Sequence, residues 1–220
     1  MFPDRLIAGY RAFLDERLPR ERARFEAQAE RQTPEIMVIG CCDSRVSPEV
    51  IFDASPGELF VMRNVANLVP PYETQGEYHG TSAALEFAVQ ALRVKHIVIL
   101  GHARCGGIQA FAEDAEPLSP GDFIGKWIGL IEPAARRLGA PGRDRQDYLT
   151  RLELASIENG LSNLMTFPCV KILVERGRLH LHGAYFGVAT GELLVRDPTT
   201  GAFSPAVPDL PPRAAGIRCF

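Results

Sequence analysis

The sequence lacks several features that would assign a protein to a class. It contains no uninterrupted apolar run of the roughly 18 residues that a membrane-spanning helix needs. It has no basic excess, since 24 Lys and Arg stand against 27 Asp and Glu, for a formal net charge of -3. Nucleic-acid-binding domains usually carry a basic patch or stripe. We therefore expect neither a membrane nor a nucleic acid as a partner.

Targeting and disulfide signals are also absent. The first residues show neither the apolar core nor the small-residue cleavage site of a secretory signal, so we expect a cytoplasmic protein. The cysteines are odd in number and scattered through a chain large enough to form a core, which does not fit a disulfide framework. We interpret them as reduced thiols and metal ligands at positions 41, 42, 105, 169 and 219.

What is present is an ordinary globular composition, with 220 residues of which 46% are hydrophobic. This length suits one domain with a sizeable core. We expect a helical arm over 1–34, an α/β core over 35–190, and an edge strand and tail over 191–220. Pro19 should divide the arm into two helices. The polar second helix is either a solvated surface helix or one that lies across a second subunit.

Two apolar runs that end in glycine carry the unusual chemistry. Ile36–Gly40 is followed by Cys-Cys-Asp-Ser-Arg, and Ile97–Gly101 is followed by His-Ala-Arg-Cys-Gly-Gly. Each run is typical of a buried strand in a parallel sheet. In open α/β sheets, ligands bind beyond the carboxyl ends of the strands. The two strand ends are therefore predicted to meet and to hold one metal.

Thiolate and imidazole are preferred zinc ligands, which makes Cys41, His102 and Cys105 the candidates. Three protein ligands leave a position open, as in catalytic zinc sites, whereas Asp43 as a fourth ligand would make a closed structural site. Asp43 could instead pair with Arg45, two residues on, and be held off the metal. The residue types alone leave these alternatives open.

Four segments, CCDSRVSPE, GELFVMRNVANLVPPYE, GTSAALEFAV and HIVILGHARCGGI, resemble the β-class carbonic anhydrases in order and spacing. The resemblance is dense over about residues 30–112. It implies zinc bound by Cys41, His102 and Cys105, and a catalytic dyad of Asp43 and Arg45. The implied fold is a mostly parallel sheet of about four strands with an antiparallel edge strand, flanked by helices. The implied assembly is a homodimer or higher even oligomer, in which the N-terminal helix embraces the partner.

Finer features resemble the plant-like branch of that family. The resemblance implies a substrate pocket formed by Gln32, Phe60, Val65, Phe87 and Gly106. Phe87 stands where tyrosine is common in that branch, so a hydrogen bond from the tyrosine hydroxyl would be missing here.

The other branch of the family uses a Trp–Arg–Tyr site for bicarbonate inhibition, with the aspartate bound to zinc. This sequence has Val38 and Phe186 at the Trp and Tyr positions and retains only Arg63. We therefore predict that no bicarbonate-locked state of that kind forms.

The resemblance implies reversible hydration of carbon dioxide to bicarbonate and a proton. We expect zinc-bound hydroxide, oriented by the Asp43–Arg45 dyad, to attack carbon dioxide. Two alternatives remain at this point: a carbonyl sulfide or carbon disulfide hydrolase on the same scaffold, and a non-catalytic zinc- or bicarbonate-binding module.

Overall fold

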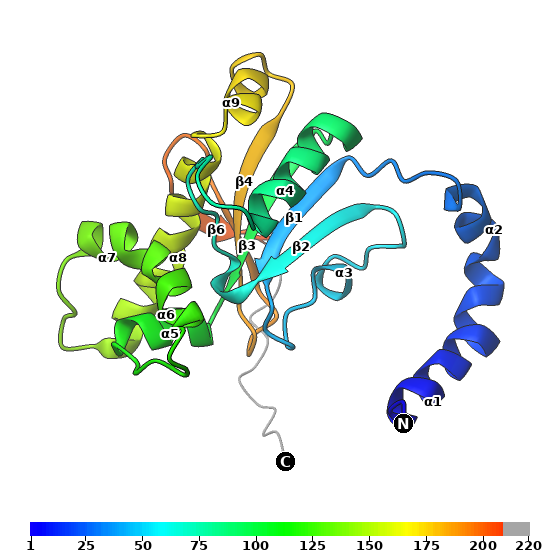
Figure 1. The fold of residues 1–220 in the computed structure, drawn as a ribbon, viewed down its shortest axis with the longest axis horizontal. Helices are drawn as coiled ribbons and strands as arrows, with labels where there is room; N and C mark the ends of the chain where they lie inside the picture. Colours follow the sequence, from blue (N-terminus) through cyan, green and yellow to red (C-terminus); the bar gives the residue numbers. More distant parts are fainter. Residues whose placement is uncertain (209–220) are drawn as a thin grey trace.

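The computed structural model describes residues 1–208, and a six-stranded sheet forms its centre (Figure 1). The strand order is β2-β1-β3-β4-β5-β6. The first four strands in that order are parallel, whereas β5 pairs antiparallel with β4 and β6 pairs antiparallel with β5. The strands are β1 (Ile36–Cys41), β2 (Leu59–Asn64), β3 (His96–His102), β4 (His180–Phe186), β5 (Leu193–Arg196) and β6 (Phe203–Pro205).

The predicted mostly parallel α/β fold is thus confirmed. The structure adds a second antiparallel strand, β6, in the stretch over 191–220 that was expected to hold one edge strand and a tail. The α-helices after the arm are α3 (Pro48–Ile51), α4 (Gly80–Glu86), α5 (Gly106–Ala112), α6 (Phe123–Ile128), α7 (Glu132–Leu138), α8 (Arg145–Leu164) and α9 (Pro168–Glu175). Among residues 1–208, no helix has the length and apolar character needed to cross a membrane.

One face of the sheet packs against α4, α8 and α9, and this packing is close between α8 and β3. A Cβ added at Gly160 of α8 would lie 2.7 Å from Ile99 Cδ1 of β3. A Cβ added at Gly101 would lie equally close, 2.7 Å, to Ile157 Cδ1. Glycine therefore lets α8 approach β3 directly before His102, which ends the strand.

The opposite face of the sheet is also apolar but less covered. Val38 of β1 and Leu100 of β3 are buried there. Ile36, Val61 and Val98 pack beside them and are only half-buried. This face therefore retains apolar surface in the single chain.

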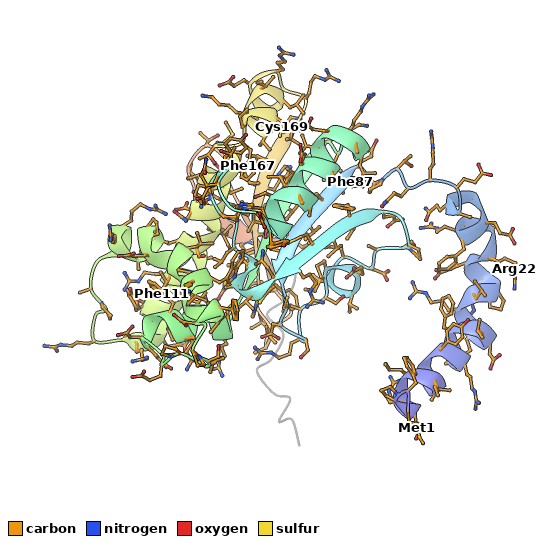
Figure 2. The ribbon with its side chains drawn as sticks, viewed as in Figure 1. Met1, Arg22, Phe87, Phe111, Phe167 and Cys169 are labelled. Atoms are coloured by element: carbon orange, nitrogen blue, oxygen red, sulfur yellow. The ribbon has the colours of Figure 1, made fainter. Side chains whose placement is uncertain are left out.

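The N-terminal arm stands apart from the sheet (Figures 1 and 2). It consists of α1 (Asp4–Ala12), a π-helical segment (Phe13–Arg17) and α2 (Leu18–Gln28), none of which contains a buried residue. The prediction that Pro19 separates two helices is wrong. The N–H of Leu18 reaches back five residues to the Phe13 carbonyl, and Pro19 falls in the first turn of α2, where its missing N–H costs little.

Candidate metal centre and active site

The structure brings the three predicted metal ligands together. Cys41 ends β1, His102 ends β3, and Cys105 directly precedes α5. Their candidate ligand atoms all lie within 4.8 Å of one another, and all three residues are buried. Zinc bonds of about 2.0–2.3 Å in a tetrahedron place two ligand atoms roughly 3.5 Å apart, so small adjustments suffice to bind the ion.

The histidine of this group is prepared for a metal. Its Nδ1 lies 3.0 Å from the Ala103 carbonyl oxygen, so that this nitrogen carries the proton and donates it. Its Nε2 is buried and has no hydrogen-bond partner among residues 1–208. A buried ring nitrogen without a partner is costly unless a ligand binds it. The donor set and this orphaned nitrogen both fit zinc.

The two thiols shift each other's pKa in opposite directions. A hydrogen bond with Cys105 is the main cause that lowers the pKa of Cys41, and the same bond raises the pKa of Cys105. The backbone N–H groups of Asp43 and Ala66 each lie 3.4 Å from Cys41 Sγ. Ala66 has a φ of 64°, a strained conformation for a residue with a Cβ. The backbone N–H of this strained residue thus donates a hydrogen bond to the Cys41 sulfur.

Asp43 and Arg45 form a two-pronged ion pair beside the metal group. Arg45 Nε and one terminal nitrogen donate to the two Asp43 oxygens at 2.9 and 2.7 Å, and the Arg45 backbone N–H adds a bond of 3.0 Å. These bonds hold the pKa of Asp43 well below its usual range. Asp43 Oδ2 is 4.0 Å from His102 Nε2. The carboxylate is therefore ionised, oriented and engaged by Arg45.

Two further residues hold this region in place, and neither was predicted from the sequence to have this role. Arg63 donates to the carbonyl oxygens of Cys41 and Asp43, both at 2.7 Å. Glu153 of α8 accepts a hydrogen bond from the Cys105 N–H at 3.0 Å. Glu153 could have been identified from the sequence, because it shares a helical face with Ile157 and Gly160, and a charged side chain on a buried face needs a partner.

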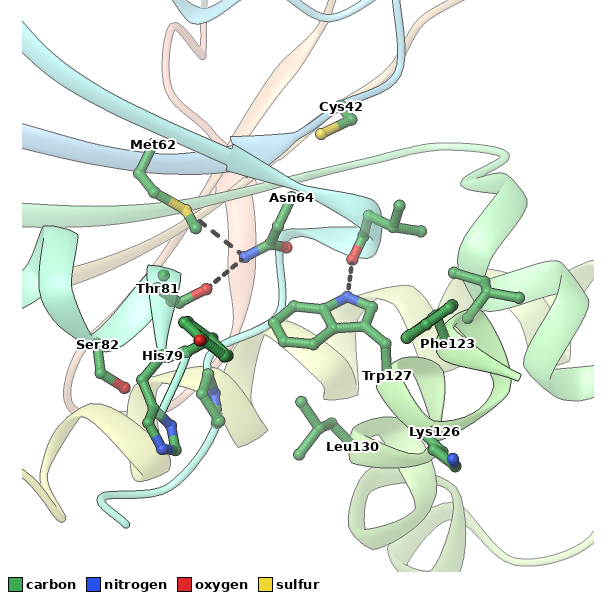
Figure 3. Close-up of a pocket in the computed structure, with 15 residues that line it drawn as sticks. Cys42, Met62, Asn64, His79, Thr81, Ser82, Phe123, Lys126, Trp127 and Leu130 are labelled. Carbon is green, nitrogen blue, oxygen red and sulfur yellow. Dashed lines mark hydrogen bonds between the residues drawn. The ribbon is translucent and has the colours of Figure 1, made fainter. Parts of the chain in front are cut away.

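A cavity of about 670 Å³ adjoins the end of β2 (Figure 3). Its lining includes Val65, Cys42 and Trp127, whose indole nitrogen donates to the Val65 carbonyl at 2.8 Å. Cys42 is exposed and faces this cavity, and the metal-ligating side chains do not line it. All the cysteines among residues 1–208 are free thiols, and Cys219 lies outside the described residues.

The residues predicted to form the substrate pocket fall into separate places. Val65 and Gly106 flank the metal group, since Gly106 follows Cys105 and Val65 precedes Ala66. Phe60 and Phe87 lie together, with ring centroids 5.9 Å apart. Phe60 is four residues before the end of β2, or roughly 13 Å along the strand. Gln32 is exposed in the segment that precedes β1. One chain does not bring these five residues to one point.

Comparison with known proteins is consistent with this geometry. Residues 36–193 match the protein family described as carbonic anhydrase. Beta carbonic anhydrase 3 of Arabidopsis thaliana is 33% identical over 192 residues, which cover 86% of this chain and 74% of that protein.

Two solved structures extend the comparison to the fold. The β-carbonic anhydrase CcaA superposes with a TM-score of 0.84 at 30% identity, covering 93% of this chain and 92% of that one. A tetrameric β-carbonic anhydrase from the ascomycete Sordaria macrospora gives a TM-score of 0.70 at 30% identity, covering 91% of this chain and 94% of that one.

Proposed function

This chain belongs to the β-class carbonic anhydrases, and from that premise we propose that it hydrates carbon dioxide reversibly to bicarbonate and a proton. The observation that carries the proposal is the buried group of Cys41, His102 and Cys105 at the carboxyl ends of β1 and β3. Zinc is the cofactor for which this donor set is suited. When bound, zinc supplies a Lewis acid that makes water a nucleophile near neutral pH.

The Asp43–Arg45 pair is proposed to orient the attacking water. Asp43 is ionised, so it accepts a hydrogen bond from that water and directs an oxygen lone pair toward the substrate carbon. Arg45 occupies both carboxylate oxygens through its side chain, which keeps Asp43 from becoming a fourth metal ligand. Arg63 holds the backbone of the same turn through the Cys41 and Asp43 carbonyls.

The rest of the pocket is proposed to come from a second copy of the chain. Gln32, Phe60 and Phe87 lie far from the metal group of their own chain, although they are the proposed substrate contacts. The arm has apolar side chains without cover, including Leu6, 54% exposed, and Tyr10, 61% exposed. A homodimer in which the arm lies across the partner buries these side chains. It also brings Phe60 and Phe87 of one chain to the metal group of the other.

The proposal is tested by stopped-flow measurement of carbon dioxide hydration with the zinc-loaded protein. Asp43→Ala is expected to lower kcat by about 100-fold or more, as for loss of a positioned proton acceptor, while one zinc per chain remains. Asp147→Asn is the matched control, because it removes an aspartate from an exposed pair with Arg151 (2.8 Å) on α8. Zinc-loaded protein that does not hydrate carbon dioxide would refute the proposal.

Carbonyl sulfide turnover, measured in parallel, separates hydration from hydrolysis on the same scaffold. The cytoplasmic location expected from the sequence stays a prediction, to be checked by fractionation of the source cells.

A further inference from the structure

A buried acid lies against the metal-binding turn. Glu153 of α8 is 3% exposed, and it is the only buried acidic side chain among residues 1–208. Moving a carboxylate out of water is costly unless its oxygens find hydrogen-bond donors. The donors that Glu153 binds therefore indicate what this carboxylate does.

Both oxygens of Glu153 are engaged. Oε1 accepts from the Cys105 backbone N–H at 3.0 Å, and Oε2 accepts from the Tyr185 hydroxyl at 2.6 Å. Burial, together with the bond to Glu153, raises the pKa of the Tyr185 hydroxyl well above its usual range, so that this hydroxyl stays a donor. The acid thus joins three elements: α8, β4 and the turn between β3 and α5.

That turn needs external support. Arg104 has a φ of 57°, in the left-handed region that residues with a Cβ rarely adopt. The Ala103 N–H is held by the Phe186 carbonyl at 2.9 Å, and the Arg104 carbonyl accepts from Arg45 at 3.2 Å. Glu153 supplies the remaining anchor, at Cys105. Each residue after His102 in this turn is therefore fixed by a different part of the fold.

We propose that Glu153 is a positioning residue for the metal centre. It fixes the backbone of Cys105 so that the sulfur stays opposite Cys41 and His102, and Tyr185 locks the carboxylate in that orientation. The inference rests on the proposed role of Cys105 as a metal ligand. Loss of a group that orients a metal ligand typically lowers metal affinity or activity 10- to 100-fold.

The test measures how fast the purified zinc-loaded protein loses zinc to excess chelator. Glu153→Leu removes the acceptor but keeps a side chain of similar length, and it is expected to speed zinc loss 10- to 100-fold. Glu153→Gln keeps an oxygen for the Cys105 N–H and is expected to stay within about threefold of the unaltered protein. Glu158→Leu is the matched control on the same helix, where the carboxylate is 41% exposed and pairs with Arg196.

A spectroscopic readout separates positioning from general packing. In the cobalt-substituted protein, Glu153→Leu should alter the thiolate-to-cobalt absorption, whereas Glu158→Leu should not. If circular dichroism shows that Glu153→Leu does not fold, Tyr185→Phe takes its place. That variant leaves the Cys105 bond but frees Oε2, and faster zinc loss is again expected.

Zinc loss from the folded variant within twofold of Glu158→Leu would overturn the inference. Because zinc loss needs no turnover, the two proposals fail separately. Protein that holds zinc but does not hydrate carbon dioxide overturns only the proposed function. Unchanged zinc loss with intact hydration overturns only the role of Glu153.

Discussion

The contact between Gly160 of α8 and Ile99 of β3 allows a quantitative prediction. A methyl group at position 160 would meet Ile99 Cδ1 at 2.7 Å, and the next neighbours lie at 3.8 Å (Val69 Cγ2) and 4.0 Å (Ile99 Cγ2). Ile99 is fully buried, so its Cδ1 has little room to move away. Ile99→Val removes that one atom and leaves only ordinary van der Waals contacts for the new methyl group.

The expected free energies follow from these distances. Gly160→Ala gains about 1 kcal/mol of helix propensity and loses about 1–3 kcal/mol to overpacking, for a net destabilisation of about 0–2 kcal/mol. Ile99→Val alone should cost about 0.5–1.5 kcal/mol. In the double variant the methyl group occupies the space left by Cδ1, so the overpacking term disappears. The free energy of unfolding of the double variant should therefore be about 1–3 kcal/mol higher than the value obtained by adding the effects of the two single variants.

The assay is urea unfolding of the four proteins at one protein concentration and one free zinc concentration, because bound metal and assembly both shift apparent stability. Circular dichroism reports the helices, and the midpoints give the coupling free energy of the cycle. Free energies that add within about 0.5 kcal/mol would refute the reasoning. They would mean that α8 moves away from β3 to accommodate the methyl group.

Three further predictions concern other parts of the molecule. Cys42→Ser should leave zinc content and hydration rate within about twofold, because Cys42 is exposed and lines a cavity that the metal-ligating side chains do not line; loss of zinc by atomic absorption would contradict this. Tyr10→Glu on the exposed arm should weaken the proposed dimer by 10-fold or more in sedimentation equilibrium, whereas an unchanged dissociation constant would argue against the arm as the contact. Burial, with His96 and His180, lowers the pKa of His182, so the unfolded chain takes up this proton first and stability falls below about pH 6.5. His182→Gln should flatten that fall in urea unfolding between about pH 7 and pH 5, and an unchanged slope would contradict it.

The parts of the fold that depend on local pattern were predictable from sequence. Short apolar runs ending in Gly40 and Gly101 indicated parallel strands, and the carboxyl ends of parallel strands meet at one edge of a sheet. Ligand chemistry then selected Cys41, His102 and Cys105, which the structure places together. The contact between Asp43 and Arg45 was one of two arrangements that their spacing allowed.

What could not be predicted depends on tertiary contacts. The helical arm continues through Pro19, which lies in the first turn of α2 directly after a π-helical segment, and the proline alone gave no sign of this. A 3₁₀ turn separates α6 from α7, and α7 begins with Pro133 in its first turn. The position of Glu153 on the buried face of α8 indicated that it needs a partner, but not which one, because Cys105 and Tyr185 come from distant parts of the chain.

The separation of Phe60 and Phe87 from the metal group of their own chain has a genetic consequence. Suppose that each pocket combines the metal group of one chain with aromatic residues of the other. A chain that is damaged in one of these two sets of residues can then still supply the other set, intact, to the second pocket. A subunit damaged at Asp43 and a subunit damaged at Phe87 would then form mixed dimers. In such a dimer one pocket carries both defects and the other carries neither. Two inactive alleles of this protein should therefore complement each other when they are expressed together.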